Sequence, residues 1–317
     1  MTWELLASIL IIGLTNGLII SLVALGYTMV YGIVELINFA HGDLVMLGSF
    51  LALTCIALSG VHGDGSWLTI GALLVVVPIF TAAVNWAVER FAYRPIRSAP
   101  KLTVLVTAIG VSFVFVNLGL FWGGLPLDAF GGGRAAAAAK DVPELIGYAN
   151  LLGAGCPIRI TAKEILVVGI TVPLLLGLTW FVRCTRLGTA MRAVAQDPVA
   201  ARLMGIDVDR IISTTFVIGG ALAGVAAVIW CVFNNTVFFT MGFRIGIDAF
   251  TAAVLGGIGN LPGAVLGGLL IGLVRALCEG AIDGGGQWVN TAVFAVLIAV
   301  LVFRPTGLLG ARVREKV

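Results

Sequence analysis

The chain has 317 residues, of which 60% carry hydrophobic side chains and only 11% are charged, with a formal net charge of +3. Globular domains in water are about one-quarter charged, and the mean hydropathy here is +1.10. This composition excludes a water-soluble enzyme, a disordered protein and a secreted disulfide scaffold, and it predicts a polytopic membrane protein.

Eight stretches contain no Asp, Glu, Lys or Arg, and each approaches or exceeds the about 20 residues with which a helix crosses a bilayer. Because the runs do not alternate in polarity, they predict helices rather than the strands of a membrane barrel. The expected fold is all-α, a transmembrane helical bundle with residues 1–317 as one domain. The stretches are 5–34, 44–63, 65–88, 102–127, 165–182, 211–243, 249–274 and 284–303.

The first run, 5–34, is not preceded by the basic residues of a cleaved signal peptide, so we expect it to be retained as a span. Thirty residues of helix would be ~45 Å long, longer than the apolar layer. A second break or an interfacial piece is therefore expected within this run.

Three segments hold most of the 19 basic residues and are expected in the cytoplasm by the positive-inside rule. The segment 123–162, the acidic loop at 279–287 and the N-terminus are then expected outside, and the C-terminus inside. The basic residues are Arg90, Arg94, Arg97 and Lys101; Arg183, Arg186, Arg192, Arg202 and Arg210; and Arg304, Arg312, Arg314 and Lys316.

This orientation requires an odd number of crossings between the outside near Asn234 and a cytoplasmic tail. One continuous span through 249–274 and one last span would make an even number. A break within Gly-Gly-Ile-Gly-Asn-Leu-Pro-Gly at 256–263 resolves the conflict. We therefore predict eight full spans and one short or irregular crossing near 240–257.

A second interruption, Ile-Asn-Phe-Ala-His-Gly-Asp at 37–43, follows the first span. Paired interrupted segments in the two halves of a membrane protein are typical of a transport pathway, since broken backbone is tolerated only where it faces protein or water. The alternative is two ordinary tight loops, with Asp43 capping the next helix. The candidate pathway residues are Asn38, Phe39, His41, Gly256, Gly257, Gly259, Asn260 and Pro262.

The basic segment 183–211 predicts two short helices on the inner side. Residues 190–196 have helix-forming composition, and Asp197 followed by proline favours the start of a second helix that Gly205 ends. The apolar side chains of this second helix share one face: Val199, Ala200, Leu203 and Met204. Docking into a groove of a partner fits this short face better than lying on lipid.

Small residues recur four apart, as at Gly13 and Gly17 and at Gly220 and Gly224, among 42 glycines. This spacing favours close packing of helices within the bundle, and a dimer face is the alternative. The alanine run at 135–139 is low-complexity, and no function is assigned to it.

The five cysteines lie far apart, and with His41 and His62 they form no metal-ligand motif. They are expected to act as small apolar side chains in helix packing, with a Cys156–Cys278 bridge as the alternative. No cofactor is expected, and the net charge follows from the inside-positive bias rather than from a nucleic-acid partner.

At this point the sequence resembles the permease subunits of branched-chain amino acid ABC transporters, the high-affinity leucine, isoleucine and valine importers. It is most similar to the H-type of their two permease types, and the resemblance runs nearly end to end. It rests on Leu-Gly-Tyr-Thr-Met-Val-Tyr-Gly at 25–32, the motif at 37–43, the segment 192–206, the segment 249–264 and Pro-Thr-Gly-Leu-Leu-Gly at 305–310.

The resemblance implies a transport subunit of a bacterial inner membrane that is not itself an enzyme. Its implied partners are a second permease subunit of different sequence, two ATP-binding subunits and a periplasmic amino-acid-binding protein. The implied contacts with an ATP-binding subunit are Arg192, Ala193, Asp197, Ala200, Ala201, Leu203, Met204 and Gly205. The chain departs from the family in the outer loop and at Arg275, where relatives carry an acidic residue.

Other classes fit less well. A secondary transporter usually keeps ionisable residues in its spans, and a channel needs a filter or a charged ring. No catalytic cluster and no Gly-x-x-x-x-Gly-Lys-[Ser/Thr] loop occurs, so ATP hydrolysis is expected on other subunits. A urea or short-amide permease of the same family and a secondary transporter remain the alternatives.

Two further expectations concern charge. Arg275 is expected to pair with Glu279 one turn later, near the outer end of its span, so that Arg275→Gln would be tolerated. A zwitterionic amino acid is expected to move along an uncharged path with weak polar contacts, to which Asn38 and His41 would contribute. For these two side chains loop capping is the alternative.

Overall fold

The computed structural model describes residues 3–34, 38–59, 67–97, 99–133, 135–153, 158–282, 284–304 and 306–310. Several predicted features lie outside these ranges: residue 37 of the first break, His62, Cys156, Asp283, Pro305 and the basic residues at 312, 314 and 316. The alternative of a Cys156–Cys278 bridge therefore falls outside the described residues. Cys55, Cys184, Cys231 and Cys278 are free thiols, and the described residues contain no cluster of potential metal ligands.

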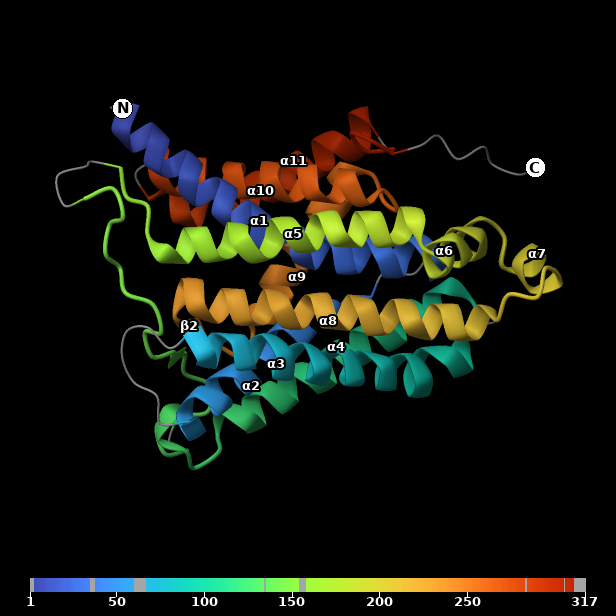
Figure 1. Cartoon of the computed structure of the whole chain (residues 1–317), viewed down its shortest axis with the longest axis horizontal. Helices are drawn as coiled ribbons and strands as arrows, with labels where there is room; N and C mark the ends of the chain where they lie inside the picture. Colours follow the sequence, from blue (N-terminus) through green and yellow to red (C-terminus); the bar gives the residue numbers. More distant parts are fainter. Residues whose placement is uncertain are drawn as a thin grey trace.

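The described chain is a bundle of helices that lie roughly side by side (Figure 1). In chain order the elements are α1 (Trp3–Val34), α2 (Ala40–Ser59), α3 (Trp67–Val88), the π-helical turn η1 (Glu89–Tyr93), the 3-10 turn η2 (Arg94–Ile96), α4 (Lys101–Gly123), η3 (Asp128–Phe130), β1 (Lys140–Asp141), α5 (Ala162–Cys184), α6 (Arg186–Gln196), α7 (Pro198–Leu203), α8 (Val208–Asn234), β2 (Thr236–Val237), α9 (Met241–Gly256), α10 (Leu261–Ala281), η4 (Gly285–Gln287) and α11 (Val289–Phe303).

Among the described residues, seven helices are long and apolar enough to cross a membrane: α1, α2, α3 with its continuation, α4, α5, α8 and α10. The predicted break is confirmed, because α9 ends at Gly256 and α10 begins at Leu261. The expected short crossing is the 16-residue helix α9. The last run was expected to be a full span, but α11 has only 15 residues.

Helix α1 is continuous over 32 residues, so the expected second break within 5–34 is wrong. Near its start Trp3 and Leu10 are exposed, whereas Leu22 and Leu25 further on are fully buried. The helix runs obliquely across its neighbours (Figure 1). Tilt accommodates a helix that is longer than the apolar layer, which makes a break unnecessary.

Glycines set the closest helix contacts, as the spacing predicted. A side-chain carbon at Gly272 of α10 would overlap the backbone of Gly13 and Gly17 in α1. In the same way Gly220 and Gly224 of α8 lie against the backbone of α3. Both pairs therefore pack within the chain, where small residues let two backbones approach closely.

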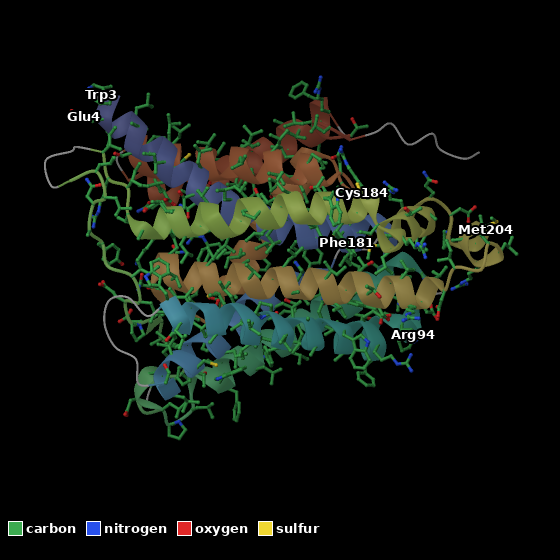
Figure 2. All side chains as sticks on the ribbon, in the orientation of Figure 1. Trp3, Glu4, Arg94, Phe181, Cys184 and Met204 are labelled. Carbon is green, nitrogen blue, oxygen red and sulfur yellow. The ribbon has the colours of Figure 1, made fainter. Side chains whose placement is uncertain are left out.

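The two ends of the bundle differ in charge. Arg94 and Cys184, which belong to the first two basic segments, lie at the end of α6 and α7, and Trp3 and Glu4 lie at the opposite end (Figure 2). The segment 123–162 occupies that opposite end, where β1 pairs antiparallel with β2 (Figure 1). The two basic segments thus share one end, as the positive-inside rule predicts.

The α1–α10 contact predicts a strong effect of a small change. In Gly272→Ala we expect a loss of about 1–3 kcal/mol of stability, because the added methyl group must push two backbones apart. Gly169→Ala in α5 is the matched control, because a side-chain carbon there meets open space. Its effect should stay within about 1 kcal/mol. Thermal unfolding of the purified permease in detergent measures both, and equal unfolding temperatures would contradict the packing.

Candidate functional site

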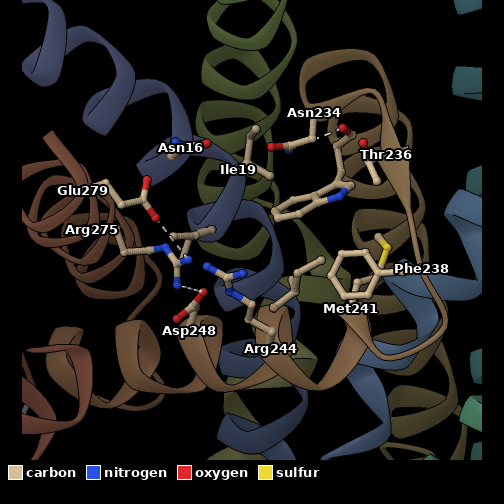
Figure 3. Close-up of a pocket in the computed structure, with 13 residues that line it drawn as sticks. Asn16, Ile19, Asn234, Thr236, Phe238, Met241, Arg244, Asp248, Arg275 and Glu279 are labelled. Carbon is tan, nitrogen blue, oxygen red and sulfur yellow. Dashed lines mark hydrogen bonds and ion pairs between the residues drawn. The ribbon is translucent and has the colours of Figure 1, made fainter. Parts of the chain in front are cut away.

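A cavity of about 310 Å³ opens at the end of the bundle opposite α6 and α7, between α1, α8, α9 and α10 (Figure 3). Its polar lining comes from five elements: Asn16 of α1, Asn234 at the end of α8, Thr236 of β2, Arg244 and Asp248 of α9, and Arg275 and Glu279 of α10. The apolar lining includes Ile19, Ile20, Phe238, Met241 and Ile245.

The sequence places the charged side chains on facing helix surfaces. Arg244 and Asp248 are four residues apart in α9, as are Arg275 and Glu279 in α10, so each pair shares one face of its helix. The two helices form a tight hairpin, because a side-chain carbon at Gly256 would overlap the backbone of Gly263. This contact brings the two charged faces together.

An ion pair joins α9 to α10 inside the cavity. The Arg275 Nη1 atom donates to the Asp248 Oδ2 atom at 2.6 Å, and the Arg275 side chain is 12% exposed and that of Asp248 9% exposed. The predicted pair with Glu279 is also present, at 3.8 Å. The sequence analysis did not anticipate Asp248, which is the closer partner.

Arg244 is exposed and makes no hydrogen bond or ion pair with any described residue. Glu279 is 45% exposed and has only its longer contact with Arg275 among the described residues. The cavity thus combines two guanidinium and two carboxylate groups, and one of each kind faces open space. This set can bind a ligand that carries both charges. The expected uncharged path involves other residues and stays a prediction.

None of the predicted pathway residues lines this cavity. A signal was nevertheless present in the sequence. Arg244 and Asp248 interrupt the charge-free runs just where a short crossing was predicted, and ionisable residues within a membrane usually mark a functional site. Their partners on α10 could not be identified, because the α9–α10 pairing is a tertiary contact.

The first break places its polar side chains in the interior. Asn38 is 4% exposed and accepts a 2.7 Å hydrogen bond from the Tyr93 hydroxyl. His41 is 1% exposed, and its ring meets that of Tyr27 edge-on with centroids 4.9 Å apart. Phe39 lines an apolar groove of about 500 Å³.

Asp43 is not the cap that the alternative reading of this break required. It lies three residues inside α2 and accepts a 2.5 Å hydrogen bond from the Ser112 hydroxyl of α4. Directly beside it, a side-chain carbon at Gly42 would overlap the backbone of Gly242 in α9. The first break is therefore anchored against α4 and the beginning of α9.

The second break is a tight turn. Gly257 and Gly259 have φ of +101° and +86°, which favours glycine, and Pro262 lies in the first turn of α10. The Asn260 Oδ1 atom caps α10 by accepting from the Gly263 N–H at 3.1 Å.

The segment 306–310 covers this turn. The Asn260 Nδ2 atom donates to the Leu309 carbonyl at 2.6 Å, and the Leu308 and Leu309 N–H groups bond the carbonyls of Leu255 and Gly256. Several backbone groups that were expected to face a pathway thus form hydrogen bonds within the chain. Gly259 lines a small cavity of about 80 Å³ together with Arg192 of α6. The first break packs against the start of α9 through Gly42 and Gly242, whereas the second break follows the end of α9 at Gly256.

The predicted pair of short helices is present as α6 and α7, at the end of the bundle that carries the first two basic segments (Figure 1). Asp197 caps α7, because its Oδ1 atom accepts from the N–H groups of Val199 at 2.9 Å and Ala200 at 3.0 Å. Gly205 follows with φ of +81°.

An apolar face of α7 is exposed. Val199, Leu203 and Met204 are 65%, 84% and 83% exposed, and Figure 2 shows Met204 at the tip of this end. Ala201, in contrast, is only 4% exposed and packs inward, and Ala193 is half-buried. These two residues pack within the chain and are not part of the exposed apolar face, and their predicted contact with an ATP-binding subunit stays a prediction.

Ion pairs connect this segment to α3 and its continuation. Asp209, at the start of α8, pairs with Arg94 at 2.8 Å and with Arg97 at 2.7 Å. Arg202 of α7 reaches the same carboxylate at 3.9 Å. Sequence analysis assigned these arginines only to orientation in the membrane.

The π-helical turn η1 extends this network toward the first break. Glu89 at its start is buried, pairs with Arg97 and accepts a hydrogen bond from Ser213. Tyr93 at its end donates to Asn38. Single π-helical turns are frequent at functional sites, and this one bridges the end of the bundle near α7 and the first break.

The ion pair between α9 and α10 gives a prediction that differs from the expected tolerance of Arg275→Gln. This substitution leaves Asp248 buried without its counter-charge, and removal of one partner from a buried pair costs about 3–5 kcal/mol. The double variant Arg275→Gln/Asp248→Asn should recover most of that loss. Thermal unfolding of the purified permease checks this, and a single variant as stable as the parent would show that the pair is not structural.

Known proteins resemble this sequence over nearly its full length. Residues 9–302 match the family of branched-chain amino acid transport system permease components. The high-affinity branched-chain amino acid permease BraD of Pseudomonas aeruginosa is 42% identical over 97% of both chains. The corresponding LivH permeases of Salmonella typhimurium and Escherichia coli K12 are 40% and 39% identical over 96% of both chains. A chain of the PsaBC complex of Streptococcus pneumoniae, solved with a Fab, has a TM-score of 0.45 at 15% identity, covering 96% of this chain and 94% of its own. The chain belongs to the branched-chain amino acid transport permease family.

Proposed function

We propose that the chain is one permease subunit of an ATP-driven importer that carries leucine, isoleucine and valine across a bacterial inner membrane. The observation that carries this proposal is the near-full-length identity of about 40% to permeases named for branched-chain amino acid transport. In this proposal a periplasmic binding protein delivers the amino acid, a permease subunit of different sequence completes the path, and two separate subunits hydrolyse ATP. The C-terminus lies in the cytoplasm and the N-terminus outside.

The charges of the cavity favour an amino acid over urea as the substrate. Arg244 and Glu279 face the cavity and can each bind one charge of a zwitterion. Urea is neutral and forms no ion pair with either group. The aliphatic lining from α1 and α9, with Ile19 and Ile245, suits a branched hydrocarbon side chain.

Uptake of labelled leucine into proteoliposomes that contain the full complex tests this function. Uptake should require ATP inside the vesicles and the binding protein outside, and it should disappear when both ATP-binding subunits are omitted. Excess isoleucine or valine should compete, and excess urea should not. A complex that carries urea but not leucine would assign the chain to the sister branch of the family. Leucine uptake without the ATP-binding subunits would exclude the ABC mechanism.

The exposed face of α7 supports a role in coupling to an ATP-binding subunit. Its three bulky apolar side chains lie at the end of the bundle where ATP would be available, and an apolar helix face of this kind docks into a groove of a partner. The Arg202–Asp209 contact then links a movement of α7 to η1 and the first break. In this coupling role, Arg192 is exposed to a partner, and Asp197 holds α7 by capping it.

Ala200→Asp should place a charge within this docking face and reduce co-purification of the ATP-binding subunits, with loss of leucine-stimulated ATP hydrolysis. Gly205→Trp should do the same, because its φ of +81° disfavours a side chain. Ala138→Asp is the matched control, an exposed alanine in the outer loop. The role of α7 in coupling is wrong if either variant keeps full stimulated hydrolysis in an assembled complex.

We also propose that the two breaks flank the pathway, on either side of α9. Asn38→Leu removes the acceptor of the Tyr93 hydroxyl, and Gly259→Val strains a residue with φ of +86° that lines a cavity. Both variants should lower the initial rate of leucine uptake at normal expression. Gly177→Val, on α5 with open space around it, is the control. Unchanged uptake in both variants would leave the breaks with a packing role alone.

A further inference from the structure

We propose that the cavity between α1, α8, α9 and α10 is a transient acceptor site for the amino acid, in which Arg244 binds the α-carboxylate and Glu279 the α-ammonium group. This inference rests on the proposed function and adds to it the residues that recognise the zwitterion. It assigns this recognition to the permease as well as to the binding protein.

Arg244 is the group available to a carboxylate. Two guanidinium groups line the cavity, but Arg275 is held by Asp248 at 2.6 Å and by Glu279 at 3.8 Å. Arg244 is exposed and forms no ion pair with a described residue. In Figure 3 its guanidinium group points into the cavity from α9. A guanidinium fork matches a carboxylate with two parallel hydrogen bonds.

Glu279 is the matching group for an ammonium. Its side chain is 45% exposed, whereas that of Asp248 is 9% exposed and is paired with Arg275. The long contact of Glu279 with Arg275 leaves lone pairs for a second donor. The cavity has two positive and two negative groups, so a zwitterion enters without changing its net charge, and an anion or a cation would leave an excess charge.

The aromatic ring of Trp230 also lines the cavity and adds to its apolar surface.

The size and the remaining lining fit a small aliphatic amino acid. The volume of about 310 Å³ lies at the lower end of the range of ligand sites, about 300–1,000 Å³. Ile19, Met241 and Ile245 are almost completely buried and form a rigid apolar wall. The position suits delivery from outside, because Asn234 and Thr236 at its rim belong to the end of the bundle that carries the N-terminus (Figures 1 and 3).

Binding of three ligands to the assembled complex, without the binding protein, tests this assignment. Leucine has both charged groups, leucinamide lacks the carboxylate, and 4-methylpentanoate lacks the ammonium group. The parent complex should bind leucine at least about 10-fold more tightly than either analogue, the discrimination expected of a charged hydrogen bond.

In Arg244→Gln the preference for leucine over leucinamide should fall to less than about 3-fold, and the preference over 4-methylpentanoate should remain. Glu279→Gln should show the reverse pattern. Arg244→Lys keeps the charge and should retain part of the preference, which keeps the test informative if the glutamine variant does not assemble. Glu144→Gln, an exposed carboxylate of the outer loop, is the matched control and should bind all three ligands like the parent.

The two proposals fail differently. If the parent complex takes up no leucine, the proposed function is wrong. If it takes up leucine, but both glutamine variants keep the parent preferences and uptake rate, the function stands and the acceptor site is wrong. An equal loss of affinity for all three ligands in Arg244→Gln, with a lower unfolding temperature, would also overturn the site, because it would show a structural role for this side chain.

Discussion

The high cost of an unpaired charge in a bilayer is the constraint on which this structure depends. Water is absent from the hydrocarbon layer, so charged side chains there must meet a counter-charge or a hydrogen-bond partner. The Asp248–Arg275 pair meets this requirement for α9 and α10. It holds the charged faces of the hairpin together beside α1 and α8, where Arg244 and Glu279 also line the cavity.

Close backbone contact is the second condition for a charged site of this kind. The short helix α9 can lie within the bundle because several of its closest contacts with other backbones involve glycine, which has no side chain. Gly242 and Gly246 lie against α2, and Gly256 lies against the start of α10. Helix α9 consequently contacts the cavity, the first break and the turn before α10.

At the opposite end of the bundle, ion pairs also join charged side chains of different helices. Asp209 forms ion pairs with arginines at η2 and in α7. The buried Glu89 pairs with Arg97 and accepts a hydrogen bond from Ser213. This network is a contiguous set of contacts from the exposed apolar face of α7 to the first break. A contiguous network is a physical route for coupling, but coupling itself is established by measured responses.

The sequence determined the class of the protein and most of its helices, because a span of about 20 apolar residues without charge has few alternatives in a chain of this composition. It also determined the break before Leu261, from a parity argument on the basic segments, and the cap of α7 at Asp197, from local turn chemistry. Only the tertiary structure decided which polar groups face one another. Arg275 was assigned to Glu279 because neighbours four residues apart can be recognised in a sequence, whereas Asp248 lies 27 residues away and becomes a partner only through the α9–α10 hairpin. For the same reason the burial of Asn38 and His41 could not be predicted, and their place along a pathway stays a prediction. Helical periodicity identifies the residues that share one face of a helix, but the packing of other helices decides whether that face meets protein or a cavity.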